Sequence, residues 1–416
     1  MARPSLIYAS PFPPLRSGVS EYSAVLARAL AAHYDVTLLI DGYGPADPAL
    51  AREFRVLRHR VDQVDPGGFD HRLYNIGNHP EYHGYVYECA LRWPGAVILH
   101  DVVLFHLVVG YYQARDAVYS KAWELEGGHA VELLKELVKS RGEKTPVRDA
   151  MLLFTEPERL PFNAELLAVS ELVLVHSEYA RSRLSGSAAG RVAAIPMVDL
   201  SPAPTPVPAR RELFARFGIP EDCLVVSSLG YVAPTKLNHE VCDVVHELNG
   251  GSGRKACYVM VGQGDYIDDA LGRYVIKTGF VGDEDFAALI EHSDVVVNLR
   301  EPSMGETSGT LFRALARGRT CVVNDAPWFA ELPAGVVTRI DNANRRAELR
   351  RVLGEWLASG RGISAVNEAA RAYVSRTHAP AVVAARVAAL LADGHSAGKS
   401  QAPPPTTAPT RRRASR

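Results

Sequence analysis

A short polar segment between two apolar runs carries the residue types best suited to chemistry. The segment "GETSG" follows the valine-rich run "DVVVNLR" and precedes an apolar, helix-like stretch. Free backbone N–H groups and the helix dipole favour an anion at such a helix start. The glutamate either caps this helix or reaches ligand hydroxyls beside the anion. We therefore predict an anion-binding turn formed by Glu306, Thr307, Ser308 and Gly309.

A lysine at a second expected helix start is the next candidate. Lys236 closes the segment "GYVAPTK", which follows the apolar run "CLVVSSLG" and precedes a helix expected over about 236–249. A cation at a helix N-terminus opposes the helix dipole. Either a bound phosphate compensates Lys236, or its side chain is simply solvated.

Two residues of the N-terminal part, Gly18 and His100, also follow strand-like apolar runs. Gly18, in "PPLRSGVS", lies between an apolar run and a helix, so it either permits a turn or lets the backbone approach a phosphate or sugar. His100, in "AVILHD", follows an apolar run. Ligands of open parallel sheets bind at the carboxyl ends of the strands, so His100 either faces a ligand or is a structural histidine of the core.

A glycine pair elsewhere is less informative. In "YVMVGQGDY" the glycines Gly262 and Gly264 lack the third glycine of a dinucleotide-binding loop, and Asp265 would repel a pyrophosphate. We interpret this stretch as a tight turn.

Alternating strand-like and helix-like segments must position these residues. The expected strands are "PSLIYAS", "DVTLLID", "HRLYNIG", "GAVILHD", "ELVLVHS" and "RVAAIPM", followed by "CLVVSSLG", "ACYVMVG", "VIKTGFV", "DVVVNLR" and "TCVVND". Continuous apolar runs that alternate with helices are typical of parallel sheets covered on both faces. The sequence therefore predicts an α/β protein with two doubly wound domains and a ligand in the crevice between them.

The proline-rich stretch "SPAPTPVPA" at 201–209 separates the two halves and predicts a linker. We expect one Rossmann-like domain over 1–200 and a second over 210–375. A last helix over 376–393 is expected to cross back to the first domain. The proline-, threonine- and arginine-rich end, 394–416, is expected to be disordered.

Bulk composition narrows the function classes. The 46 Lys and Arg residues balance 47 Asp and Glu residues, so no global field favours nucleic acid. The five cysteines are scattered, which indicates buried thiols in a reducing cytoplasm. No apolar run is long enough for a signal peptide or a membrane span. We expect a cytoplasmic protein whose C-terminal arginines give a weak peripheral contact at the inner membrane face.

The order of these motifs resembles the retaining glycosyltransferases of family 4, which have the GT-B fold. The resemblance covers about residues 4–390. It rests on "PPLRSGVSEYSAVLARAL", "LHDVVLFH", "VHSEYARSRL", "GYVAPTK", "VGDEDFAALIEHSDVVVNLREPSMGETSG", "ALARGRTCVVND" and "FAEL", in that order. It implies a nucleoside diphosphate sugar bound mainly by the second half.

The resemblance also implies residue roles. Lys236 would neutralise the diphosphate, Gly18 would approach the donor by its amide, and His100 would line the sugar site. Glu306 and the amides after it, those of Thr307, Ser308 and Gly309, would hold the sugar and the distal phosphate. The base would be held by the turn that contains Phe280, Val281 and Gly282. His100, Glu306 and Lys236 are thus the catalytic candidates.

Two departures from the family pattern matter. The family's second glutamate, which binds ribose, is replaced by Arg313 when the helices are aligned on "ALARG". The arginine that the family commonly carries shortly before the diphosphate lysine is missing from "GYVAPTK". Either Arg300 or Arg313 could work with Lys236 in its place, or the diphosphate is held less tightly.

The sequence shows no Asp-x-Asp pair at a strand end, so we expect no metal and no cofactor beyond the donor. The acceptor is a carbohydrate, a lipid-linked compound or a small molecule. Two other functions stay open. A nucleotide-sugar epimerase would need acid and base carboxylates, for which Glu306 and Asp101 are the candidates, and a non-catalytic nucleotide-sugar binding protein would fit the missing glutamate.

Overall fold

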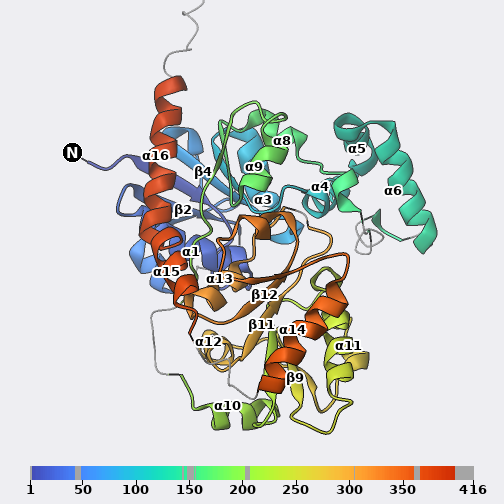
Figure 1. The fold of residues 1–416 in the computed structure, drawn as a ribbon. Helices are drawn as coiled ribbons and strands as arrows, with labels where there is room; N and C mark the ends of the chain where they lie inside the picture. Colours follow the sequence, from blue (N-terminus) through green and yellow to red (C-terminus); the bar gives the residue numbers. More distant parts are fainter. Residues whose placement is uncertain are drawn as a thin grey trace, which may run out of the picture.

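The computed structural model describes residues 2–42, 48–142, 145–147, 154, 156–201, 207–303, 305–359 and 366–398. Within these residues two parallel sheets lie one above the other, each flanked by helices (Figure 1). The prediction of two doubly wound α/β units is confirmed.

The first half forms a seven-stranded sheet in the order β3-β2-β1-β4-β5-β6-β7. All of its strand pairs are parallel. Its elements are β1 (Ser5–Ala9), α1 (Gly18–Leu30), β2 (Asp35–Ile40), α2 (Pro48–Glu53), β3 (Arg55–Arg58), β4 (His71–Ile76), α3 (Pro80–Arg92), β5 (Ala96–Leu99), α4 (Phe105–Gln113), α5 (Val118–Glu126), α6 (Gly128–Arg141), α8 (Ala164–Val169), β6 (Leu172–Val175), α9 (Glu178–Leu184) and β7 (Arg191–Ala194).

The second half forms a six-stranded parallel sheet in the order β10-β9-β8-β11-β12-β13. Its elements are α10 (Arg210–Phe217), β8 (Leu224–Leu229), the 3-10 turn η4 (Pro234–Lys236), α11 (Asn238–Leu248), β9 (Ala256–Val261), β10 (Val275–Lys277), α12 (Asp283–Glu291), β11 (Val295–Asn298), α13 (Gly309–Ala316), β12 (Cys321–Asn324), the 3-10 turn η6 (Pro327–Glu331), β13 (Thr338–Ile340), α14 (Arg345–Ser359), α15 (Glu368–Thr377) and α16 (Pro380–Gly398).

Both sheets reverse their strand order at one place, between β1 and β4 and between β8 and β11. Ligands of doubly wound sheets bind where the order reverses, at the carboxyl ends of the strands. The segments after β1, β5, β8 and β11 carry Gly18, His100, Lys236 and Glu306, respectively. The topology therefore gathers loops that are far apart along the chain.

Two edge strands, β3 and β13, were not predicted. β3 has exposed arginines at both ends, and β13 is three residues long, so neither shows a continuous apolar run. The predicted last helix over 376–393 is also corrected, because α15 ends at Thr377 and α16 runs from Pro380 to Gly398. The proposed linker at 201–209 and the disordered tail remain predictions, since residues 202–206 and 399–416 lie outside the described residues.

The C-terminal helix returns to the first half, as predicted. α16 packs along α1, and Tyr34 Oη donates a hydrogen bond of 3.3 Å to the carbonyl of Ala388 (Figure 1). Val383, Ala384 and Val387 of α16 are fully buried. They belong to one apolar cluster that includes residues of both sheets, so the two halves share a continuous core.

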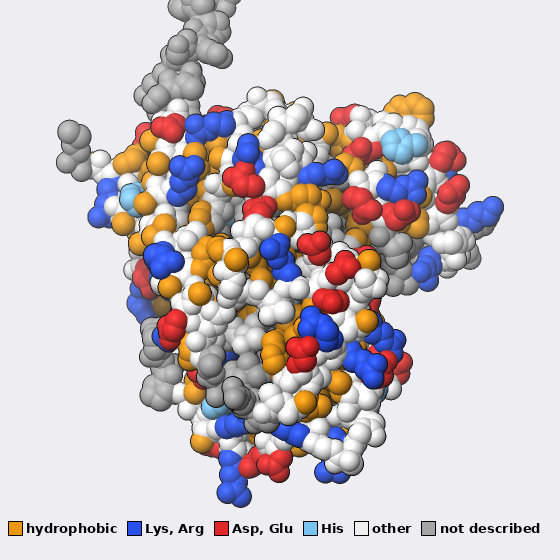
Figure 2. All heavy atoms as spheres, in the orientation of Figure 1, with side chains coloured by type: hydrophobic (Ala, Val, Ile, Leu, Met, Phe, Trp, Pro, Cys, Tyr) orange, Lys and Arg blue, Asp and Glu red, His pale blue; other side chains and the backbone are white. Residues whose placement is uncertain are grey.

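The charge distribution on the visible face and the state of the cysteines agree with what the composition predicts. On the face shown in Figure 2, basic and acidic side chains are interspersed. All five cysteines are buried and free. Among the described helices, none has both the length and the apolar character required to cross a bilayer.

Candidate functional site at the junction of the two sheets

The polar segment after β11 leads into α13, as the sequence predicts. Ser308 is the N-cap, and its hydroxyl accepts a 3.3 Å hydrogen bond from Leu311 N–H and a 3.0 Å bond from Asn298 Nδ2. This cap fixes the start of the helix at Gly309. The first N–H groups of a helix have no intrahelical acceptor, and the dipole makes this end positive. The start of α13 can therefore receive an anion.

Glu306 does not cap α13. Its Oε1 lies 3.3 Å from Nε of Arg300, which directly follows the last residues of the β11 run, and its Oε2 accepts a bond from Ser303 Oγ. The Arg300 side chain is only 12% exposed and that of Glu306 23% exposed. Burial lowers the pKa of Arg300, while the neighbouring Glu306 and Asp101 carboxylates oppose that shift.

Lys236 ends η4, at the carboxyl end of the adjacent strand β8. Its Nζ donates a 2.7 Å hydrogen bond to the carbonyl of Leu229. Burial, followed by repulsion from Arg300, lowers the pKa of Lys236 well below its usual value. The two loops are joined directly, because Glu301 N–H donates a 2.9 Å bond to the carbonyl of Thr235. The structure thus brings together Lys236 and the segment after β11.

The first half contributes Asp101, from the loop after β5. Its pKa is raised to about 7, mainly by burial and then by the charge of Glu306; a backbone hydrogen bond from Asn78 and the charge of Arg300 oppose the rise. Asp101, Glu306, Arg300 and Lys236 are therefore electrostatic neighbours across the two halves. Lys236 and Arg300 thus lie beside two carboxyl groups, of which Asp101 has its pKa near neutrality, and an anionic ligand bound here would favour the charged forms of both basic side chains.

His100 belongs to a buried network beneath this site. Its Nε2 lies 2.6 Å from Asn75 Oδ1, and an amide oxygen only accepts, so Nε2 carries the proton. Its ring meets Tyr22 edge-on, with centroids 4.8 Å apart. Burial, then the neighbouring His176 and His83, lower the pKa of His100 well below its usual value. The imidazole is therefore neutral at physiological pH.

Glycines allow the two halves to approach closely. Gly305 has φ +82°, and a Cβ there would lie 2.5 Å from Val102 Cγ2 of the first half. A Cβ at Gly309 would lie 3.1 Å from Met197 Cε. Gly18 is the first residue of α1, after the cap Ser17, and nothing lies within 4 Å of its virtual Cβ. Of these three glycines, only Gly18 has free space where a Cβ would stand.

The predicted base turn and the predicted ribose residue are linked, because Arg313 in the last turn of α13 pairs with Asp283, which follows Gly282. Phe280 is 55% exposed, and the Arg16 guanidinium lies 4.5 Å above its ring. Val281 packs against the shared core, and Gly282 is the N-cap residue of α12. Arg313 is buried, with Nη1 3.3 Å from Glu21 Oε2 and Nη2 3.6 Å from Asp283 Oδ1. Arg313 thus ties α13 to α1 in the first half.

The glycine pair after β9 has a structural role. A Cβ at Gly262 would lie 2.1 Å from the carbonyl oxygen of Gly230, and one at Gly264 equally close to that of Val232. These glycines let the loop after β8, which carries Lys236, pass directly over them. The interpretation as a turn instead of a dinucleotide loop fits this packing.

Two residues of the charged cluster, Arg300 and Asp101, were not among the predicted donor-site residues. Each directly follows a strand-like apolar run, "VVVNL" for Arg300 and "AVILH" for Asp101. A charged residue at that point lies at the ligand-binding edge of a parallel sheet, so this position was the available signal. Among the described residues, no group of three or more His, Cys, Asp or Glu side chains is placed to hold a metal ion.

No family model matches the chain, and no curated protein sequence matches it. Solved structures do match. Sucrose-phosphate synthase from Thermosynechococcus elongatus aligns with a TM-score of 0.62 at 15% identity, covering 95% of this chain and 100% of that one. HepE of Anabaena, solved with UDP and glucose, aligns at 0.59 and 13% identity over 94% and 100%. WaaG, a glycosyltransferase of lipopolysaccharide biosynthesis, aligns at 0.57 and 14% identity over 93% and 99%.

These alignments span nearly the whole of each chain and agree on the architecture. The predicted fold class is confirmed: the chain has the GT-B fold, with two Rossmann-like domains that face a cleft and a C-terminal helix that crosses back to the first domain.

Proposed function

We propose that the protein is a glycosyltransferase that moves a sugar from a nucleoside diphosphate sugar to an acceptor hydroxyl, with retention of anomeric configuration. One observation carries the proposal. Lys236 and Arg300 lie buried beside Glu306 and the start of α13, where the two sheets meet. Two cations and free N–H donors suit a doubly charged leaving group.

The donor would lie along α13. Its diphosphate would meet Lys236, Arg300 and the amides of Thr307, Ser308 and Gly309. Its sugar would meet Glu306 and the region of His100, and its base would meet the turn at 280–282, with Arg313 near the ribose. HepE, which shares the fold, has been solved with UDP and glucose and with UDP-glucose, which supports a nucleotide-sugar donor here.

Bond cleavage would depend on stabilising the leaving diphosphate. As the anomeric carbon gains oxocarbenium character, negative charge grows on the phosphate oxygen, and preorganised donors stabilise it. Each donor of this kind is worth about 2 to 4 kcal/mol in the transition state. In a front-face reaction the departing phosphate oxygen takes the proton of the acceptor hydroxyl, so retention needs no separate base. We propose that the reaction needs no metal.

We assign the acceptor to the first domain. Two adjoining cavities of about 390 and 330 Å³ share Asp41, Arg60, Glu81 and Tyr85, and Leu15 of the β1–α1 loop lines the larger one. Paired charges beside aromatic rings can bind hydroxyls and the apolar face of a sugar. A carbohydrate or a lipid-linked sugar fits this lining.

The test is incubation with a panel of nucleoside diphosphate sugars, with and without simple sugar acceptors, followed by chromatography and NMR of the products. Acceptor-dependent release of nucleoside diphosphate, with the donor's anomeric configuration in the product, supports the proposal. An altered sugar on an intact nucleotide would indicate an epimerase, and binding without turnover a binding protein. Unchanged rates in EDTA would support metal independence.

A further inference from the structure

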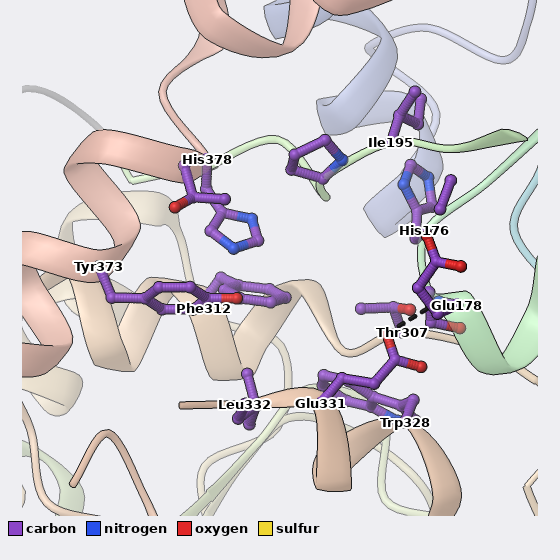
Figure 3. A pocket seen from close by; sticks show the side chains of 14 residues that line it. His176, Glu178, Ile195, Thr307, Phe312, Trp328, Glu331, Leu332, Tyr373 and His378 are labelled. Atoms are coloured by element: carbon purple, nitrogen blue, oxygen red, sulfur yellow. Dashed lines mark hydrogen bonds between the residues drawn. The ribbon is translucent and has the colours of Figure 1, made fainter. Parts of the chain in front are cut away.

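A third cavity lies between the two halves and reaches the segment after β11 at Thr307. Its volume is about 240 Å³. Figure 3 shows His176 and Ile195 of the first half facing Thr307, Phe312 and Trp328 of the second. Neither Lys236 nor Arg300 lines it. The cavity therefore adjoins the proposed diphosphate site at Thr307 but does not include its two basic side chains.

The cavity also borders both places where the chain crosses between the halves. Pro196 lines it where the chain leaves β7, and His378 lines it between α15 and α16. The two crossings are bonded to each other, since Asp199 N–H donates a 2.9 Å bond to the carbonyl of His378 and His378 Nδ1 lies 2.7 Å from the carbonyl of Met197. A molecule in this cavity would touch the natural hinge of the fold.

Several residues that line the cavity carry buried polar atoms without a partner within the described part of the chain. They are Thr307 Oγ1, Trp328 Nε1, His378 Nε2 and both ring nitrogens of His176. Trp328 and His378 are each only 3% exposed. Buried polar atoms in folded proteins almost always have a partner, so orphan atoms on four lining residues favour an occupant with hydrogen-bonding groups.

The donor and acceptor roles of these atoms indicate which chemical groups the ligand must carry. A carbonyl only accepts, so His378 Nδ1–H donates to Met197 and Nε2 is left as an acceptor. The Trp328 indole N–H only donates, and the Thr307 hydroxyl does both. Hydroxyl groups both donate and accept, so a ligand with several hydroxyls can serve such atoms, while the Phe312, Trp328 and Tyr373 rings offer apolar faces for C–H groups.

Charge excludes an anion. No lysine or arginine is present among the described residues that line the cavity. Two of these described residues carry carboxylates. That of Glu178 pairs with Arg181 at 2.5 Å, and both oxygens of Glu331 accept backbone N–H bonds, of 2.8 Å from Glu178 and 2.7 Å from Tyr179. The free polar atoms are therefore left for a neutral ligand.

We propose that this cavity binds a neutral sugar or polyol at a site separate from the donor site. Because its walls come from both halves, the ligand stabilises the domain arrangement seen here over more open ones.

The experiment measures binding without any nucleotide, so its failure is distinguishable from failure of the proposed function. Glucose, galactose, mannose and glycerol are titrated into the full chain, and binding is followed by calorimetry and by the change in tryptophan fluorescence that is absent from the Trp328→Phe variant. Saturable 1:1 binding of at least one probe is expected, and excess UDP should leave it in place. Trp328→Phe keeps the aromatic ring but removes the N–H donor, so binding should weaken about five- to tenfold.

Tyr373→Leu, on another wall, provides a second test and should also weaken binding. Trp123→Phe is the matched control, because Trp123 is 65% exposed on α5. Thermal unfolding verifies that each variant is folded. No saturable binding of any probe up to about 50 mM, or binding that neither cavity variant weakens, would mean that the cavity holds only ordered water and would overturn the proposal.

Discussion

Arg300 Nε lies 3.3 Å from Glu306 Oε1, and this pair stands between Lys236 and the first domain's Asp101. The family that the sequence resembles commonly carries its second cation shortly before the diphosphate lysine. In this chain a cation comes instead from the end of the neighbouring strand β11. Of the two arginines that the sequence offered as partners of Lys236, Arg300 is the one whose charge acts on Lys236, while Arg313 pairs with Glu21.

Replacement of Arg300 should weaken nucleotide binding. Arg300→Met removes a charge-assisted contact to the diphosphate, so the affinity for UDP, or for the nucleoside diphosphate that gives the largest thermal shift, should fall about 10- to 100-fold. Calorimetry measures the change. Arg346→Met, on α14 and half-exposed, is the control and should bind normally. Equal affinities of the Arg300 variant and the wild type would contradict a role for Arg300 at the phosphates.

Asp101 should make stability depend on pH. Its folded-state pKa of about 7 exceeds the ordinary 3.8, so between these values the folded protein holds a proton that the unfolded chain has lost. Stability attributable to Asp101 therefore falls as pH rises from about 4 to about 7 and stays level above. Asp101→Asn should remove this loss and gain at most about 4 kcal/mol at about pH 8, with little gain at about pH 4.

Urea unfolding at both pH values measures the difference. Asp62→Asn is the comparison, because hydrogen bonds from Arg58 lower the pKa of Asp62 and the substitution should give no gain at high pH. A gain for Asp101→Asn that is the same at both pH values would show that Asp101 ionises normally in the folded protein.

Gly305→Ala should destabilise the fold by about 1 to 3 kcal/mol. The position has φ +82°, and the new methyl group would collide with Val102 across the domain junction. Thermal unfolding reports the loss, and Val102→Ala in the same chain should recover part of it. Gly18→Ala is the control for stability, because its Cβ meets open space. A Gly305→Ala protein as stable as the wild type would mean that the two domains do not meet here.

The stability of the fold should depend on the opposite charges of Arg313 and Glu21. Arg313→Glu restores the residue type of the family, but it would place a carboxylate beside Glu21 and Asp283 and should cost about 2 kcal/mol. The double variant Arg313→Glu with Glu21→Arg should recover part of this cost, as measured by urea unfolding. Failure of the second change to help would indicate that the two side chains do not pair across the domains in solution.

Most of the fold was predictable because both sheets are buried on both faces. Every segment that the sequence predicts as a strand contains one, and the strands missed were the edge strands β3 and β13, which are short or carry exposed arginines. Local pattern alone cannot detect such strands, because only their pairing with a neighbour stabilises them.

The site was predictable only in part. Lys236 and Glu306 lie on loops after β8 and β11, which pair in the sheet, so the topology places them together. The buried position of His100, the pairing of Arg300 with Glu306, and the link from Arg313 to Glu21 depend on side-chain packing across the two domains. Sequence spacing carries no information about packing between residues so far apart along the chain.

In the proposed reaction Lys236 stabilises the departing diphosphate during sugar transfer. The most direct test is the rate of transfer from the preferred nucleoside diphosphate sugar by Lys236→Met, compared with the wild type and with Lys135→Met, an exposed control on α6. We predict that Lys236→Met remains folded and loses about 100- to 1,000-fold in rate, while the control keeps wild-type activity. Wild-type turnover by a folded Lys236→Met protein would contradict the account.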